Sequence, residues 1–171
     1  MLINGAGGGV GTFALQLAKR QACIVWGVDT GGKLEAMSAM GFDRVIDYRK
    51  QDFTCLGERF DLMVDTKTKR TARELARTLT PDGRYVTVGG DPGRLIALLF
   101  ARWSGRRNMR IVALKSNKNL DDLAPLLSTG ALKPVIDGPH PLSDAPRLIR
   151  YFGEGRHTGK VVMTVAESHG Q

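Results

Sequence analysis

The chain has 171 residues, which is enough for one sizeable hydrophobic core and too few for two full domains. Hydrophobic residues make up 42% and charged residues 25%, as in an ordinary globular protein, and no apolar run approaches the ~20 residues of a membrane span. Because no basic region and apolar leader begin the sequence, we expect a cytoplasmic protein with no membrane partner.

The formal net charge of +8 prompts the question of a nucleic-acid partner. Basic residues concentrate at 67–77 and 102–110, but Trp103 is the one aromatic residue there that could stack on a base. No nucleic-acid motif accompanies them, so we interpret both stretches as solvated surface or as surface facing a partner domain, and expect no nucleic-acid partner. The cysteines and histidines are scattered, which predicts no metal site.

Strand and helix patterns alternate along the chain. The six strands of the predicted sheet cover residues 2–4, 23–28, 44–47, 60–64, 84–88 and 110–114. Helices are predicted over 11–20, 33–40, 72–79, 95–101 (a buried helix or a lid), 120–127 and 142–152. This order predicts an α/β protein with a doubly wound, parallel six-stranded sheet, the Rossmann fold, whose ligands bind at the carboxyl ends of the strands.

A glycine-dense turn connects the first predicted strand to the first helix. Glycines at 5, 8 and 11 would let the backbone turn sharply, let a phosphate approach without a Cβ in the way, and let the helix pack close to its strand. The free N–H groups and positive end of the helix would face the anion. The turn therefore predicts a dinucleotide pyrophosphate site, and the alternative is a structural turn that binds nothing.

Other candidate side chains follow neighbouring strands at the same edge. Asp29 lies 18 residues after Gly11, where a carboxylate would bind the adenosine ribose and favour NAD. Lys33 and Tyr48 lie where a cation and a phenol would surround a 2′-phosphate and favour NADP. The choice between NAD(H) and NADP(H) therefore stays open. The same edge also receives Asp65, Gly89 and Gly90, which follow the fourth and fifth strands.

The C-terminal part of the chain carries two further predicted strands, over residues 133–136 and 160–165. They would pair with each other, extend the six-stranded sheet, or join a sheet that belongs to another domain. We therefore expect a nucleotide-binding domain over 1–130, and a C-terminal helix and strands over 131–171.

Several motifs occur in a familiar order. In residues 3–19, Gly-Gly-Val-Gly is followed by Gln-Leu-Ala-Lys, and further motifs lie at 41–48, 79–86, 88–90, 130–136 and 159–165. Together they resemble the medium-chain dehydrogenase/reductase family, in its zinc-independent quinone oxidoreductase-like branch. The resemblance implies a pyrophosphate site at Gly8, Gly9, Val10 and Gly11, an adenosine-ribose or 2′-phosphate site at Asp29, Lys33 and Tyr48, and a nicotinamide contact at Gly89 and Gly90.

This resemblance implies an NAD(P)H-dependent oxidoreductase that transfers hydride to a quinone, an enone or a similar electrophilic small molecule. The chain departs from the family in two ways. The loop 65–70, Asp-Thr-Lys-Thr-Lys-Arg, is bulkier and more basic than usual. The family also has a β-rich, GroES-like catalytic domain before the first strand, which we expect to be missing here. The C-terminal strands would belong to that missing domain.

We therefore predict no catalytic side chain in this chain, and as a partner either a separate catalytic domain or a second copy. Two other classes of function stay open. One is a module or truncated relic that binds NAD(P)H without turnover. The other, which rests on the glycine turn and the acid after the second strand alone, is a methyltransferase that binds S-adenosylmethionine.

Overall fold

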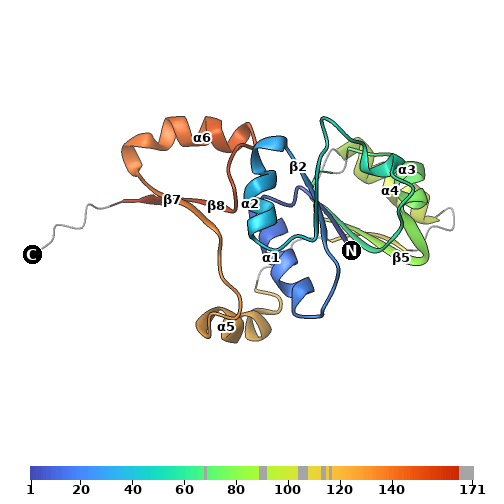
Figure 1. The fold of residues 1–171 in the computed structure, drawn as a ribbon, viewed down its shortest axis with the longest axis horizontal. Coiled ribbons are helices and arrows are strands. Elements are labelled where there is room, and N and C mark those ends of the chain that lie inside the picture. The colour runs from blue at the N-terminus through green and yellow to red at the C-terminus, as the bar shows by residue number, and fades with distance from the viewer. Residues whose placement is uncertain (68, 89–91, 104–107, 113–114, 116, 166–171) are drawn as a thin grey trace, which may run out of the picture.

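The computed structural model describes residues 1–67, 69–88, 92–103, 108–112, 115 and 117–165. Six parallel strands form one sheet in the order β3-β2-β1-β4-β5-β6 (Figure 1). This strand order is that of the doubly wound Rossmann fold, so the predicted fold class is confirmed. The strands are β1 (Leu2–Asn4), β2 (Trp26–Asp29), β3 (Arg44–Asp47), β4 (Phe60–Asp65), β5 (Leu79–Thr87) and β6 (Met109–Ile111).

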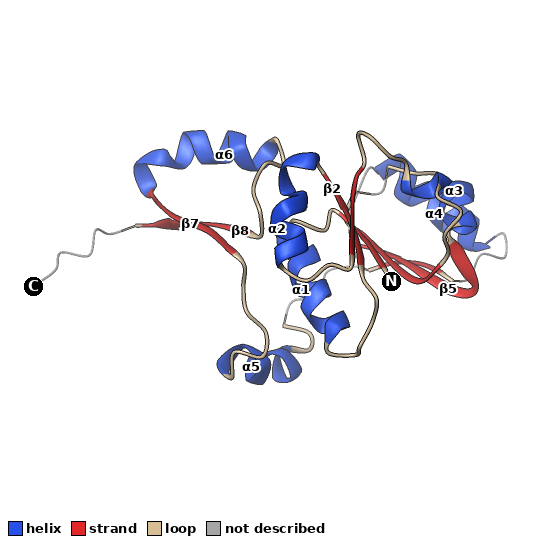
Figure 2. Cartoon of the chain, viewed as in Figure 1, coloured by secondary structure: helices blue, strands red, loops and turns tan. Residues whose placement is uncertain are grey.

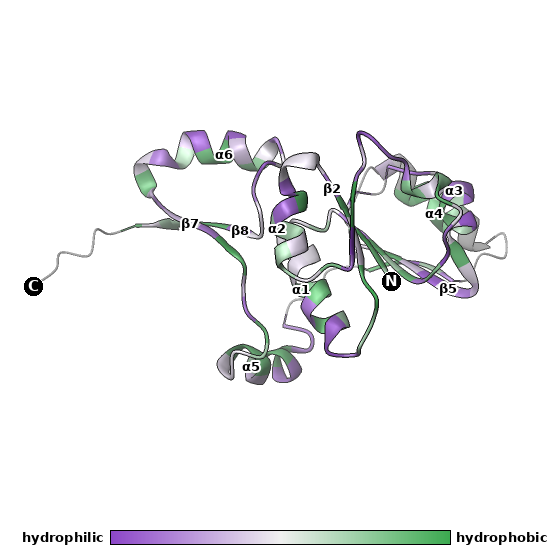
Figure 3. Ribbon diagram, viewed as in Figure 1, coloured by the Kyte–Doolittle hydropathy of each residue, from purple (hydrophilic) through white to green (hydrophobic). Residues whose placement is uncertain are grey.

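Helices cover both faces of the sheet. One side carries α1 (Gly9–Lys19) and α2 (Leu34–Ala39), and the other carries α3 (Ala72–Arg77) and α4 (Pro92–Trp103) (Figure 2). Burial on both faces requires apolar residues along the whole of each central strand, and Figure 3 shows the strands as mostly hydrophobic.

Two separate cores result from this arrangement, because successive side chains of a strand point to opposite faces of the sheet. Leu2 belongs to the core that includes Met63 and Leu75, whereas its neighbour Ile3 belongs to the core that includes Leu15. Both β1 residues are completely buried, so this short strand is the common centre of the two cores.

The C-terminal part forms a small second sheet. It contains α5 (Leu120–Ser128), β7 (Ile136–Pro141), α6 (Ala145–Gly153) and β8 (Lys160–Thr164). Among the described residues, β7 and β8 pair in parallel with each other and do not extend the six-stranded sheet. That they also join a sheet of another domain stays a prediction. The first of these strands begins at Ile136, where the predicted one ends. Before it, the backbone of Lys133 bonds to the Gln16 side chain of α1, and the carbonyl of Val135 accepts a bond from the N–H of Lys160, the first residue of β8.

The second strand begins at Trp26 rather than at residue 23. The side chain of Asp43 accepts a 2.6 Å hydrogen bond from the backbone N–H of Val25, and so replaces a strand partner there. Cys23, which the apolar run places in a strand, lies outside it and is partly exposed. Trp26 packs edge-on against Phe60, with ring centroids 5.2 Å apart, at the amino end of β2. It therefore lies at the opposite end of β2 from the carboxyl edge.

The face that α1 buries differs in part from the predicted one. The helical spacing predicts that Val10, Ala14, Leu17 and Ala18 face the core; Ala18 is buried, but Val10 is 50% and Leu17 37% exposed. The helix instead buries the side that includes Gly11, Leu15 and Ala18, because the glycine lets that side approach the end of β1 closely.

Two further elements differ from the sequence prediction. The predicted turn at 81–83 lies inside β5, as an irregularity where Leu79 pairs with Phe60 and Arg84 pairs with Leu62. The apolar stretch 95–101 belongs to α4, which buries Leu98 and exposes Ile96, Leu99 and Phe100. Within the described ranges, no helix combines the length and the apolarity that crossing a membrane requires.

Replacing Gly11 with alanine should destabilise the fold. A Cβ at this position would collide with the backbone of Ala6, which cannot move without displacing the glycine turn. Gly32→Ala is the matched control, because a Cβ there has no atom within 4 Å. In urea denaturation we expect Gly11→Ala to lower the free energy of unfolding by about 1–3 kcal/mol and the control to change it little. Equal effects of the two substitutions would contradict this packing argument.

Candidate functional site

The turn between β1 and α1 leaves the first N–H groups of the helix open. Gly8 is the N-cap residue, so no side chain caps these groups, and the first helical turn holds no acidic residue. Gly5 has a φ of +79°, and a Cβ there would collide with the hydroxyl of Thr66. The turn thus presents backbone donors and the positive end of α1 to whatever lies in front of it, as an anion site requires.

Asp29 and Lys33 form a buried ion pair against this turn. Nζ of Lys33 lies 3.5 Å from Oδ1 of Asp29, and the two side chains are only 6% and 5% exposed. The carboxylate also accepts hydrogen bonds from the backbone N–H groups of Gly7, at 2.9 Å, and of Thr30, at 2.8 Å. In the sequence analysis Asp29 favoured NAD and Lys33 favoured NADP. In the structure the two side chains form one electrically neutral pair, and Asp29 holds the glycine turn in place.

Asp65, at the end of β4, is completely buried and serves as a second anchor. Its carboxylate accepts hydrogen bonds from the Asn4 amide and the Tyr85 hydroxyl, each at 2.9 Å. It also accepts a 2.8 Å bond from the backbone N–H of Lys67. These bonds fix the start of the basic loop 65–70 relative to β1 and β5.

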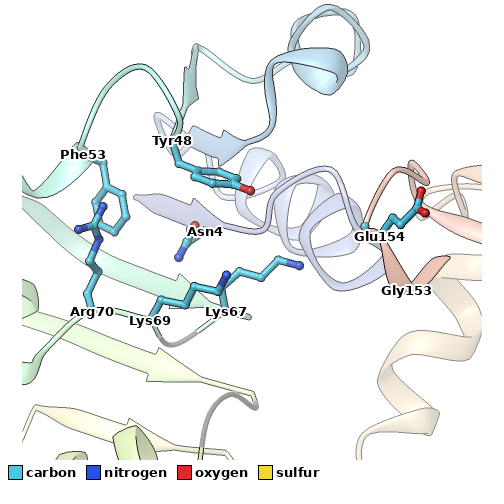
Figure 4. A pocket seen from close by; sticks show the side chains of 9 residues that line it. Asn4, Tyr48, Phe53, Lys67, Lys69, Arg70, Gly153 and Glu154 are labelled. Carbon is cyan, nitrogen blue, oxygen red and sulfur yellow. The ribbon is translucent and has the colours of Figure 1, made fainter. Parts of the chain in front are cut away.

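A cavity of about 430 Å³ opens at the carboxyl edge of the sheet, in front of β1 and beside the basic loop (Figure 4). Tyr48, which follows β3, lies on one side of it, and the loop after β4 supplies cationic side chains on the opposite side. Its lining residues include Asn4, Tyr48, Phe53, Lys67, Lys69 and Arg70, with Gly153 to Gly155 at the far end.

A second cavity, of about 230 Å³, lies directly in front of the glycine turn and adjoins the first, since both are lined by Lys67, Gly153 and Gly155. Five of the residues predicted from the sequence line this smaller cavity, namely Gly8, Gly9, Val10, Asp29 and Lys33. Tyr48 lines the larger cavity, whereas Gly11 and Asp65 support the site from within the fold. Gly89 and Gly90 lie outside the described residues.

The sequence analysis missed the contribution of the segment between α6 and β8. The backbone N–H of Gly159 donates a 2.8 Å hydrogen bond to the carbonyl of Gly7, and Gly159 bridges Gly8 in parallel. The side chain of Asp137 holds this segment by accepting bonds from the Tyr151 hydroxyl, at 2.8 Å, and the Thr158 N–H, at 3.2 Å. Burial opposes ionisation of Asp137, but these hydrogen bonds outweigh it and lower the pKa of the carboxyl group.

His157 is the functional-site candidate that this segment introduces. Its ring stacks on Phe152, with centroids 4.3 Å apart, and lines the cavity in front of the glycine turn. Among the described residues, its buried Nδ1 has no hydrogen-bond partner. The glycines at 155 and 159 were the available signal, because both adopt positive φ values and bend the chain towards the turn.

With this geometry in place, comparison with known proteins identifies the family. The model of a zinc-binding dehydrogenase family matches residues 40–163, which is most of the chain. The chain belongs to the medium-chain dehydrogenase/reductase family. In the described part of the chain, no group of three or more His, Cys, Asp or Glu side chains could hold a metal ion.

Members of this family with similar sequences include two plant reductases. The chain is 32% identical over 170 residues to 2-methylene-furan-3-one reductase of Solanum lycopersicum. It is 30% identical over 167 residues to the chloroplastic NADPH-dependent alkenal/one oxidoreductase of Arabidopsis thaliana. In both comparisons the match covers 95% of this chain and 39% of the relative, so the chain spans well under half of their length.

A solved structure shares the fold. The quinone oxidoreductase from Coxiella burnetii superposes with a TM-score of 0.75 at 24% identity, over 96% of this chain and 52% of that one. The matched part in all three comparisons is the part of the family that contains the six-stranded sheet and the C-terminal strands.

His157 should titrate below the ordinary histidine range. Burial is the main cause of its lowered pKa, and the positive charges of Lys33 and Lys67 add to it, against the opposing charges of Asp137 and Asp29. The unfolded chain therefore takes up this proton more readily, so the free energy of unfolding should fall as the pH drops below about 6.5. An NMR titration, with the ring signal assigned by its loss in His157→Asn, tests this. A midpoint at or above 6.5 would contradict the described environment.

Proposed function

We propose that this chain is the nicotinamide-nucleotide-binding part of a zinc-independent oxidoreductase that reduces a small electrophilic acceptor, such as a quinone or an enone. The observation that carries the proposal is the uncapped start of α1, which opens into two adjoining cavities at the carboxyl edge of the sheet. The names of the two plant relatives, 2-methylene-furan-3-one reductase and NADPH-dependent alkenal/one oxidoreductase, support this class of acceptor.

Each predicted site residue has a role in this proposal. The backbone of Gly8, Gly9 and Val10 binds the pyrophosphate, and Gly11 brings the helix close enough to do so. The Asp29–Lys33 pair holds the glycine turn in place. Tyr48 lines the cavity that would receive the adenosine part of the nucleotide. Asp65 fixes the start of the basic loop. The predicted nicotinamide contact of Gly89 and Gly90 remains part of the proposal.

The residues of this chain bind and orient, and none of them is assigned a proton or a covalent bond to the substrate. When bound, NAD(P)H supplies a hydride to an electrophilic carbon of the acceptor, and a proton from solvent completes the reduction. The chain contributes a fixed anion site and two adjoining cavities at the carboxyl edge of the sheet, which orient the dinucleotide. The acceptor pocket is assigned to a separate catalytic domain or to a second copy of the chain.

Isothermal titration of the purified chain with NADPH and NADH tests this proposal. We expect micromolar binding of at least one of the two nucleotides. Binding of S-adenosylmethionine in preference to both would favour a methyltransferase instead. Oxidation of NADPH on addition of an enone or quinone then separates an enzyme from a module that binds without turnover.

Gly8→Ala should impair binding while sparing the fold. Among the described residues beyond its chain neighbours, a Cβ at Gly8 would contact only the carbonyl oxygen of Gly5, at 3.5 Å. Gly8 itself lines the cavity in front of the turn. The added methyl group would occupy space that a phosphate needs. We expect about tenfold or greater weakening for both nucleotides, with a loss of about 1 kcal/mol or less in the free energy of unfolding.

Gly32→Ala is again the matched control for this measurement, since its methyl group meets nothing within 4 Å. Unchanged nucleotide affinity in Gly8→Ala would place the pyrophosphate somewhere other than the start of α1.

A further inference from the structure

The charge of Lys33 is already compensated inside the fold. Its ammonium group pairs with Asp29 at 3.5 Å. Its aliphatic chain packs so close to Gly7 that a Cβ on this glycine would lie only 2.7 Å from Cδ of Lys33. A buried ammonium that leaves its carboxylate would expose an uncompensated charge at low dielectric, which is costly. Lys33 is therefore poorly placed to bind a ligand anion in addition to Asp29. Because Lys33 balances the charge of Asp29, this carboxylate in turn repels a ligand anion only weakly.

Two other cations face the larger cavity from the basic loop. Lys67 and Lys69 extend their side chains into it beneath the ring of Tyr48 (Figure 4). Within the described ranges, neither ammonium group forms an ion pair. The cavity thus holds two positive charges that the protein itself does not neutralise.

The other charged residues that line this cavity, Arg70 and Glu154, each form an ion pair with a residue of opposite charge. Arg70 binds Asp52, with Nη1 and Oδ2 2.9 Å apart, and Glu154 binds Arg156 at 3.2 Å. The unneutralised charge of the cavity therefore comes from Lys67 and Lys69 alone. A phosphate monoester carries about −1.5 to −2 charges at pH 7, which matches two ammonium groups. The phenol of Tyr48 adds a hydroxyl that can donate a hydrogen bond to a phosphate oxygen.

We propose that Lys67 and Lys69 bind the 2′-phosphate of NADP(H), and that this loop rather than Lys33 makes the chain prefer NADP(H) to NAD(H). The inference rests on the proposed function. It fits the connected geometry, because Lys67 lines both cavities: a pyrophosphate at the glycine turn and a ribose phosphate beside Tyr48 can belong to one ligand. Charge-assisted hydrogen bonds to a phosphate discriminate strongly against a ligand that lacks it.

The test compares Lys67→Gln/Lys69→Gln with the wild-type chain in isothermal titrations of NADPH, NADH and adenosine 2′,5′-bisphosphate. We expect the double variant to bind NADPH about 10- to 100-fold more weakly. The loss of NADH affinity should be much smaller, because of the two lysines only Lys67 also lines the cavity assigned to the pyrophosphate. Lys115→Gln/Lys118→Gln is the matched control, because it removes the same charge from exposed positions that line neither cavity. Circular dichroism checks that each variant is folded.

The outcomes separate this proposal from the proposed function. Equal weakening of NADPH and NADH would overturn the 2′-phosphate assignment, because the lysines would then act on a group that both nucleotides share. Lysine-dependent binding of adenosine 2′,5′-bisphosphate without binding of either dinucleotide would support the phosphate site and count against the oxidoreductase. Binding of none of the three ligands by the folded wild-type chain would overturn both.

Discussion

The hydrogen bond from the backbone N–H of Gly7 to the buried carboxylate of Asp29 is the constraint on which the site depends. It ties the glycine turn to the end of β2 and fixes the direction in which α1 starts. The same carboxylate also accepts a hydrogen bond from the N–H of Thr30 and forms an ion pair with the ammonium group of Lys33. Lys33 therefore compensates its negative charge inside the fold. Because Asp29 fixes the turn through the Gly7 N–H, the N–H groups at the start of α1 stay available to a ligand.

The C-terminal segment closes the same turn from another side. The N–H of Gly159 donates to the carbonyl of Gly7, so the segment that leads into β8 is tied to the glycine turn. Asp137 holds the intervening chain through Tyr151 and Thr158, and thereby places His157 against the cavity. The proposed cofactor edge is therefore built by residues from both ends of the sequence, although no described strand belongs to both sheets.

The order of strands and helices could be predicted because each element carries its own periodicity, and the glycine turn because its shape needs glycine. Asp29, Lys33 and Tyr48 could be placed at the edge by counting from the turn. Their pairing could not, since the burial of Lys33 depends on its packing against Gly7 in three dimensions. His157 escaped prediction for a similar reason: its position follows from the bond between Gly159 and Gly7, which no local pattern reveals.

The Asp29–Lys33 pair also limits how this protein can be engineered. An acid at the end of β2 is commonly treated as a removable selector for one cofactor, but here it is architectural. Exchanging it for a neutral or basic residue would leave Lys33 without its counter-ion and the Gly7 N–H without its acceptor. The turn would loosen before any selectivity changed. Substitutions at Lys67 and Lys69 are better suited to changing the nucleotide preference, because both side chains are exposed and neither holds the turn.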